Sequence, residues 1–364
     1  MYAYIGTMAS QDDPARGITV VDLDGPRTRV AGSTAGSATN PMYFATSADQ
    51  AVLYAAHATA DGQVSAWMVR GAVLTQLGPT RHTGGGVACH LSVDPRGRHL
   101  LTTNYASGTI AVHTINDDGT LGDASDVIQH PGVGTRGRRQ GGSHPHMITA
   151  DPSDRPGRGH FLAVDLGTDT IYRYRLDTST GHLDEADLVT LPLGTGPRHL
   201  AVHGDYAYVV GELGSTVTVL DLNTSPPTVL TTVLSHATVG AGPCYPSAIR
   251  FSPDGRFCYV LNRGPNTVAT FTVDGPDLSL IATVDSGGDY PWDATIHDDH
   301  LYVVNQRSST LSVFYVDPRS GVPQITDTSI DVPCPVCILP IGVPSPQALP
   351  AGRSEVASTR DGLI

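Results

Sequence analysis

The most informative absence in this chain of 364 residues is lysine, because all 22 basic residues are arginine. Without lysine, Schiff-base chemistry and lysine general bases are excluded. A fixed positive charge in any site must come from arginine, whose planar guanidinium suits bidentate binding of carboxylate or phosphate. Glutamate is nearly absent as well, since it occurs only as Glu185, Glu212 and Glu355.

Cysteine is scarce too. The five cysteines are scattered and odd in number, which argues against a disulfide framework. Cys334 and Cys337 form the motif CPVC, which would fit zinc or redox chemistry. No second pair or histidine partner lies at ligand spacing, and residues three apart in a strand face opposite sides. We therefore interpret the motif as structural and predict neither a metal nor a cofactor.

The chain lacks an excess of positive charge and any long apolar run. Its net charge of −13 argues against nucleic acid as a partner, because phosphate contacts need a basic surface. No apolar run approaches the roughly 18 residues of a membrane span, and the first residues do not resemble a secretory signal. We therefore expect a cytoplasmic protein that binds neither nucleic acid nor membrane.

What the chain does contain is many turn formers and a repeat. Forty glycines, 27 prolines and 16% charged residues indicate short strands joined by turns, and no amphipathic helical period of useful length is present. A bulky residue, two small or β-branched residues and a polar residue recur seven times, 43 to 61 residues apart. The copies begin at Tyr4, Tyr54, Leu101, Leu162, Tyr208, Tyr259 and Tyr302.

Each copy is followed by an alternating strand, and most are preceded by a strand that begins near a proline. This is the pattern of a β-propeller blade. We predict an all-β fold, a single seven-bladed propeller over residues 1–340. A strand near residues 327–339 would close the ring with the first blade, and residues 341–364, rich in Pro, Ala and Ser, would form a mobile tail.

Aligning the blades on the proline that opens the innermost strand converts sequence positions into rings around one channel mouth. Asn and Asp at the ends of the second strands are ordinary turn formers. The unusual residues lie in blades three to six and are not required by any turn: His144, His146, Arg198, Glu212 and Arg263. An ion pair across the channel remains a structural alternative for Arg198 and Glu212, and blade packing remains one for His90 and His199.

At this point the chain resembles a known family. The motifs YAYIGT, NPMYFATSAD, RQGGSHPHMITADP, GPRHLAVH, ELGSTVTVLD, LNRGPNTVATF and PCPVC occur in its order over about residues 2 to 340. The family that the chain resembles is the seven-bladed propeller lactonase family, which contains propeller-type 6-phosphogluconolactonases and fungal carboxymuconate-lactonizing enzymes. The resemblance places the family's His-x-His on His144 and His146, its Pro-Arg-His on Arg198 and His199, and its Arg-Gln on Arg139 and Gln140. Its Glu falls on Glu212, and the NRG arginine is Arg263.

Opening a lactone needs a base that activates water and a cation that stabilises the oxyanion. We predict that the catalytic residues are His144, His146 and Glu212, with the choice of base left open. We expect the substrate to be bound by residues of the same mouth: Arg198, Arg263, Arg139, Trp292, His90, His199, Tyr43 and His57.

One departure from the family bears on the substrate. Trp292 stands where the family usually has arginine, which makes the mouth more aromatic and favours a flat acid over a sugar phosphate. The leading hypothesis is a metal-independent lactonase of the 6-phosphogluconolactonase type, acting on a small anionic substrate as a monomer or weak dimer. The alternatives are a cyclase or isomerase of a specialised pathway and a non-catalytic propeller that binds a ligand or protein.

Overall fold

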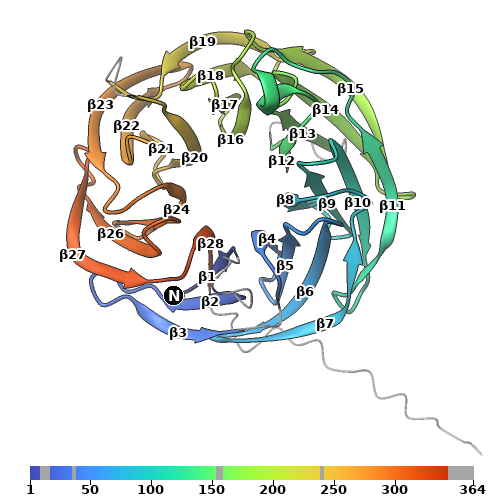
Figure 1. The fold of residues 1–364 in the computed structure, drawn as a ribbon, viewed down its shortest axis with the longest axis horizontal. Coiled ribbons are helices and arrows are strands. Elements are labelled where there is room, and N and C mark those ends of the chain that lie inside the picture. Colours follow the sequence, from blue (N-terminus) through green and yellow to red (C-terminus); the bar gives the residue numbers. More distant parts are fainter. Residues whose placement is uncertain (9–16, 35–37, 153–158, 238–241, 343–364) are drawn as a thin grey trace, which may run out of the picture.

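The chain forms a ring of seven sheets around a central axis. The computed structural model describes residues 1–8, 17–34, 38–152, 159–237 and 242–342. In this part of the chain every sheet has four strands, and neighbouring strands pair antiparallel (Figure 1). Among the described residues there is no α-helix, only the 3-10 turn η1 (Gly137–Gln140). The prediction of an all-β, seven-bladed propeller is confirmed.

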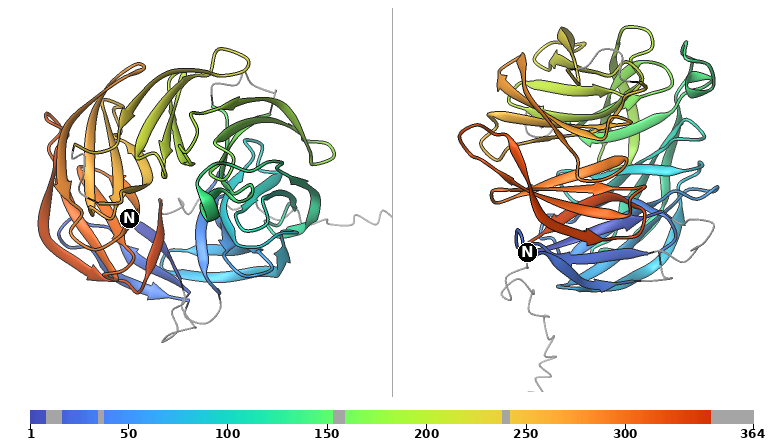
Figure 2. Two further views of the ribbon diagram at one scale, coloured as in Figure 1. Left: turned by 45° about the horizontal axis from the view of Figure 1, so that its top comes forward. Right: turned by 60° about the vertical axis from the view of Figure 1, so that its left-hand side comes forward.

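Six blades are each built from four consecutive strands, with the first strand innermost and the last at the rim. The two tilted views show these blades side by side around the axis (Figure 2). The six are β4 (Pro41–Thr46), β5 (Val52–His57), β6 (Gln63–Arg70) and β7 (Val73–His82); β8 (Ala88–Val93), β9 (His99–Asn104), β10 (Thr109–Ile115) and β11 (Leu121–Gln129); β12 (Pro145–Ala150), β13 (His160–Asp165), β14 (Thr170–Asp177) and β15 (His182–Thr190); β16 (Pro197–His203), β17 (Tyr206–Gly211), β18 (Thr216–Asp221) and β19 (Thr228–Leu234); β20 (Tyr245–Phe251), β21 (Phe257–Arg263), β22 (Thr267–Asp274) and β23 (Asp277–Asp285); and β24 (Pro291–His297), β25 (His300–Asn305), β26 (Thr310–Val316) and β27 (Pro323–Asp331).

The seventh blade joins the two ends of the chain. Its order is β28 (Pro335–Ile341), β1 (Tyr2–Thr7), β2 (Ile18–Asp22) and β3 (Arg29–Ser33), so the last strand supplies the innermost position. The closing strand was expected near residues 327–339, but residues up to Asp331 belong to β27 of the preceding blade. The chain turns between the two, where Cys334 has a φ of 39°, and Pro335 opens β28.

The C-terminal boundary and the cysteines follow from this closure. Strand β28 continues to Ile341, and the tail predicted beyond it lies, from residue 343 on, outside the described residues. All five cysteines are free, and Cys337 of the CPVC motif is buried in the core beside Tyr4. This position in the core supports the structural interpretation of the motif. None of the described residues forms a helix that is long and apolar enough to cross a membrane.

A tyrosine that recurs on the second strand joins several blades to the next blade around the ring. Tyr4, Tyr54, Tyr208 and Tyr259 are almost fully buried. Their hydroxyls donate to backbone carbonyls of the next blade, as from Tyr4 to Gly71 at 2.5 Å and from Tyr259 to Gly321 at 3.0 Å. A buried phenol needs such a partner. Four of the seven copies therefore contribute the same contact between blades, whereas the copies at Leu101 and Leu162 have no hydroxyl, and Tyr302 accepts from the backbone N–H of Gly25.

A β-bulge recurs at the start of the innermost strand and aims one side chain at the axis. In the blade of β12, Pro145 pairs with Asp165 and Met147 with Val164, so His146 is the extra residue. A bulge leaves its extra residue unpaired and bends the strand. The extra residues around the ring are Met42, Cys89, His146, Arg198, Trp292 and Val336, with Ser247 and Ala248 at the corresponding step of β20. The ring deduced by aligning the prolines is therefore confirmed.

Candidate active site at the channel mouth

Glu212 is the centre of the site. It follows β17 directly, and its backbone N–H donates to the carbonyl of Gly196 at 2.8 Å, which fixes it beside the start of β16. Its carboxylate, only 2% exposed, is contacted by three guanidinium groups. Arg263 lies 2.7 Å from Oε2, Arg198 lies 3.1 Å from the same oxygen, and Arg139 binds Oε1.

The balance of charge at Glu212 sets its protonation state. Burial alone would raise its pKa, but Arg263, Arg198 and Arg139 outweigh burial and lower the pKa from 4.5 to about 2. Burial and the neighbouring Arg263 lower the pKa of Arg198 to about 10. Near neutral pH the cluster thus holds three positive charges and one negative charge. The ion pair considered for Arg198 and Glu212 is present, within a larger cluster.

Arg198 is held by the backbone of the neighbouring blade, Arg263 by the backbone of its own blade, and both by an aromatic ring. Arg198 donates to the carbonyl of Ser247, and Arg263 donates to that of Tyr245 at 2.9 Å. Both guanidiniums also lie over the ring of Trp292, at 5.6 Å and 5.0 Å from its centroid. Such cation–π contacts stabilise a guanidinium that has lost its water. The predicted neighbours Arg198, Arg263 and Trp292 are therefore brought together.

Gln140 positions Arg139. Its side chain is fully buried and makes four hydrogen bonds. The carbonyl oxygen accepts from the N–H groups of Thr135 and Arg136, and the amide donates to the carbonyl of Leu166 and to Asp169. All four hydrogen-bonding positions of the amide are thus used. The turn η1 is anchored, and the adjacent Arg139 is placed against Glu212.

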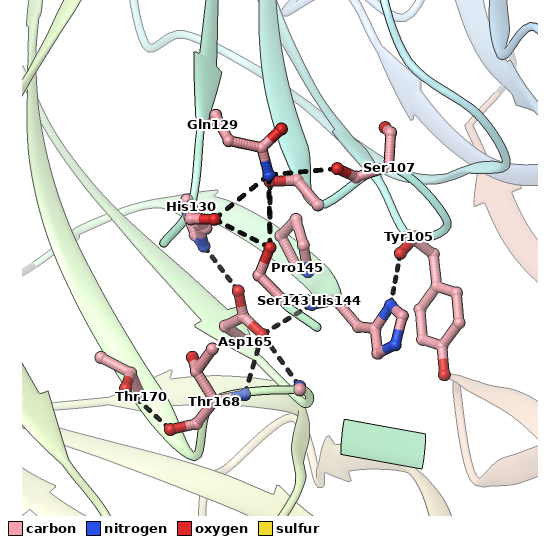
Figure 3. A network of polar contacts seen from close by, with 12 residues as sticks. Tyr105, Ser107, Gln129, His130, Ser143, His144, Pro145, Asp165, Thr168 and Thr170 are labelled. Carbon is pink, nitrogen blue, oxygen red and sulfur yellow. Dashed lines mark hydrogen bonds and ion pairs between the residues drawn. The ribbon is translucent and has the colours of Figure 1, made fainter. Parts of the chain in front are cut away.

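His144 is held by a polar network centred on Asp165 (Figure 3). The Asp165 carboxylate accepts from the backbone N–H of His144 at 2.8 Å, from those of Gly167 and Thr168, and from His130 Nδ1 at 2.7 Å. His144 Nδ1 in turn donates to the carbonyl of Tyr105 at 2.7 Å, and the two rings stack at 4.5 Å. Asp165 thus serves the structural role expected of a turn former.

His146 is the histidine beside the charged cluster. It is 7% exposed, and its Nδ1 has no hydrogen-bond partner among the described residues. Burial and then Arg198 lower its pKa well below 6.5, against the attraction of Glu212. The imidazole is therefore neutral at pH 7 and can accept a proton.

Three of the predicted binding residues lie in a connected group with His146. Tyr43 stacks on His90 at 3.9 Å, His90 meets His199 edge-on at 5.7 Å, and His199 meets His146 at 5.4 Å. Burial lowers the pKa of His90 and of His199 well below 6.5. Tyr43 also lines a cavity of about 200 Å³ together with Arg250 and Asp293, an ion pair at 2.5 Å. Contact with substrate stays a prediction for these three residues.

His57 is used by its own blade. Its Nδ1 donates to the carbonyl of Thr39 at 2.7 Å, and its Nε2 accepts from the hydroxyl of Ser65 at 2.7 Å. Burial lowers its pKa. Both ring nitrogens are thus partnered, and no contact joins His57 to the Glu212 cluster. These contacts favour a structural role over the substrate-binding role predicted from its position.

The described residues offer little that could hold a metal ion. No group of three His, Cys, Asp or Glu side chains in this part of the chain converges with suitable geometry. Both oxygens of Glu212 are taken by guanidinium groups. What the arrangement offers instead is a neutral imidazole, His146, beside a buried cluster with surplus positive charge.

The comparisons with known proteins agree with this fold. The family model described as "Lactonase, 7-bladed beta-propeller" matches residues 2–340. The chain belongs to this lactonase family. A relative, the 6-phosphogluconolactonase of Bacillus subtilis (strain 168), is 32% identical over 314 residues, which cover 82% of this chain and 86% of the relative. The resemblance inferred from the motifs is confirmed.

Solved structures of similar proteins place this propeller lactonase in the same group. The periplasmic gluconolactonase PpgL of Pseudomonas aeruginosa superposes with a TM-score of 0.86 at 28% identity, covering 94% of this chain and 99% of that one. A putative 6-phosphogluconolactonase from Bacteroides fragilis NCTC 9343 gives a TM-score of 0.84 at 27% identity, covering 93% and 97%. The family and these relatives therefore indicate an enzyme that acts on lactones.

Several residues of the lactonase mouth escaped the sequence analysis. Tyr105 carries the ring that stacks on His144 and lies edge-on to His146 at 5.6 Å. Tyr290 and Arg307 flank the Trp292 side of the mouth. All three lie in turns that the repeat alignment treated as spacers. Tyr105 immediately follows Asn104 at the end of the second strand, the position that held Glu212 in the blade of β17, and that equivalence could have revealed it.

Proposed function

We propose that this protein hydrolyses a small anionic lactone of the 6-phosphogluconolactone type at the mouth around Glu212. One observation carries the proposal: three guanidiniums converge on a single carboxylate, and two of them, Arg198 and Arg263, are at most 4% exposed. Uncompensated positive charge that is buried is costly, so an anion is favoured here. A carboxylate, a phosphate or a developing oxyanion would supply the missing negative charge.

His146 is the general base in this proposal. Both oxygens of Glu212 are bound by guanidinium groups, and these cations lower its pKa to about 2, so neither oxygen is open to accept a proton from water. His146, by contrast, has no hydrogen-bond partner at Nδ1 among the described residues, and its imidazole is neutral because burial and Arg198 lower its pKa. Glu212 instead positions Arg198, Arg263 and Arg139, and holds them together against their mutual repulsion.

The reaction uses one proton acceptor and two cations. His146 takes a proton from water as the water oxygen bonds to the lactone carbonyl carbon, and the carbonyl electrons move to its oxygen. Arg198 and Arg263 stabilise that oxyanion. When the ring C–O bond breaks, the leaving oxygen takes the proton back from His146. The product is a hydroxy acid, which ionises at neutral pH and releases the proton that an assay detects.

The mechanism needs neither metal nor cofactor. Water activation and oxyanion stabilisation, the two tasks that a metal would perform, are both assigned to side chains of the chain itself. Absence of an effect of a strong chelator on the rate would agree with this part of the proposal.

The test is acid release from 6-phosphogluconolactone, corrected for spontaneous hydrolysis. We expect acceleration by the natural protein and its loss in Arg263→Ala, with Arg256→Ala, a surface arginine paired with Asp254, as the control. Acid release at the spontaneous rate from both this lactone and unphosphorylated gluconolactone would contradict the proposal. That result would return attention to the cyclase, isomerase and non-catalytic alternatives.

The cytoplasmic location and the monomeric or weakly dimeric state remain predictions. Light scattering on the purified protein and fractionation of the source cells test them. The Pseudomonas aeruginosa relative is named periplasmic, so location has to be measured for each member.

A further inference from the structure

Arg307 occupies the position in its blade that Leu213, the residue after Glu212, occupies in the blade of β16. Gln306 donates its backbone N–H to the carbonyl of Tyr290 at 3.0 Å, as Glu212 does to Gly196 at 2.8 Å. The backbone N–H of Arg307 donates to the backbone carbonyl of Asp289 at 3.1 Å, as the backbone N–H of Leu213 does to the carbonyl of Thr195. The two turns are therefore superimposable in their hydrogen bonding. Arg307 accordingly lies at the mouth that contains Glu212, two blades further around the ring.

The Arg307 guanidinium is held by a ring instead of by a carboxylate. It lies 3.7 Å from the centroid of the Tyr290 ring. Its side chain is exposed, and it forms no ion pair with any residue that the structure describes. The other three arginines of the mouth are all paired with Glu212. Arg307 therefore combines a fixed position with hydrogen-bond donors available to a ligand.

A continuous wall connects Arg307 to the buried cluster. Arg263 lies 5.2 Å from the Tyr290 centroid and 5.0 Å from that of Trp292, and the two rings are 5.8 Å apart. Arg263 also reaches Glu212 at 2.7 Å. The wall runs from an exposed cation, across two aromatic rings, to the cations proposed to stabilise the oxyanion. A ligand with an anionic group at its far end would match this order.

We propose that Arg307, which lies over the ring of Tyr290, is the subsite for the terminal phosphate of the lactone. This inference rests on the proposed function, which places the lactone carbonyl at Arg198 and Arg263. In a 6-phosphorylated lactone the phosphate is carried on an exocyclic carbon, several bonds from the carbonyl carbon, so the two groups can contact different cations. A guanidinium suits phosphate, which it can bind through two parallel N–H groups. The presence of Trp292 suggested from the sequence that a sugar phosphate is disfavoured; Arg307 supplies a cation on that same wall.

The experiment combines substitution of Arg307 with removal of the phosphate from the substrate. Values of kcat/KM are measured for 6-phosphogluconolactone and for unphosphorylated gluconolactone with the natural protein, Arg307→Ala and Arg307→Lys. Charge-assisted hydrogen bonds predict that Arg307→Ala lowers kcat/KM for the phosphorylated lactone about 10- to 100-fold. The unphosphorylated lactone should change less than about two-fold, and Arg307→Lys should restore part of the loss.

The matched control is Arg256→Ala, which also removes a guanidinium lying over an aromatic ring, at 5.1 Å from Phe257. It should leave the ratio between the two substrates unchanged. Equal losses for both lactones in Arg307→Ala, or no loss for either, would overturn the phosphate subsite while leaving the lactonase intact. Failure of the natural protein to hydrolyse either lactone would overturn the proposed function and this inference with it.

Discussion

Two buried carboxylates at neighbouring blade ends have contrasting surroundings. Asp165, at the end of β13, accepts hydrogen bonds from three backbone N–H groups and from His130. Glu212, directly after β17, is contacted instead by three arginine side chains. The first carboxylate satisfies the donors of its own loop, and the second holds three cations from different blades together. Carboxylates at nearly the same place in a repeated fold can thus serve folding or chemistry, according to their partners.

The largest effect expected is on activity, from loss of the base. His146→Ala should lower kcat about 10²- to 10⁴-fold, the usual contribution of a general base. The matched variant is His144→Phe, which keeps a ring to stack on Tyr105 but removes both ring nitrogens. Steady-state kinetics with the lactone separate the two. A larger loss in His144→Phe than in His146→Ala would transfer the role of base to His144.

The difference in role between Glu212 and Asp165 can be tested by substituting each carboxylate. Glu212→Gln removes the negative charge between the arginines, so kcat/KM should fall about 10²-fold or more. Asp165→Asn leaves the arginine cluster in place but weakens the loop, so its main effect should be a loss of about 1–3 kcal/mol in the free energy of unfolding. Urea unfolding and kinetics on both variants provide the measurement. Equal activity losses at unchanged stability would show that the distinction is wrong.

Acid should lower the free energy of unfolding, because it protonates Glu212 and weakens the arginine cluster around it. The folded pKa of about 2 lies below the ordinary value of 4.5, so the contribution of Glu212 is complete above about pH 4.5 and declines as pH falls toward 2. The shift corresponds to about 3 kcal/mol. Urea unfolding between pH 2.5 and 6 should show this slope, and Glu212→Gln should reduce it. An unchanged slope in the variant would assign the acid sensitivity to other carboxylates.

The activity should not fall at the pH where an ordinary histidine becomes protonated. Because the pKa of His146 is lowered well below 6.5, the base stays neutral as pH falls through 6.5. We therefore expect kcat/KM to hold steady through that range and to decline only at lower pH. A decline centred at 6.5 or above would contradict a buried, neutral His146.

The smallest effect should come from a contact between blades remote from the mouth. Tyr259→Phe removes only the hydroxyl that donates to Gly321, and should cost about 1 kcal/mol of unfolding free energy. Kinetic constants should stay unchanged. A change in KM would show that the blade contacts and the mouth are coupled.

Repetition is the reason that much of this molecule could be predicted from its sequence. Seven copies of one motif predict seven blades, and their shared prolines predict which residues surround the mouth, since each blade folds by the same local rules. His146, Arg198 and Trp292 were found in this way, and the bulges confirm that they occupy equivalent positions in their blades. His57 shows the limit of that method: it has a ring position, but both its nitrogens bind within its own blade.

By itself the sequence determined the architecture, several of the charged residues proposed for the mouth and the exclusion of lysine chemistry. Only the tertiary structure decided how those charges are divided. It placed three arginines on Glu212 and left His146 without a partner at Nδ1. It also set Arg307 on Tyr290. The reason is physical: protonation and affinity depend on burial and on distances between different blades, and such distances are not encoded in the spacing of any one repeat.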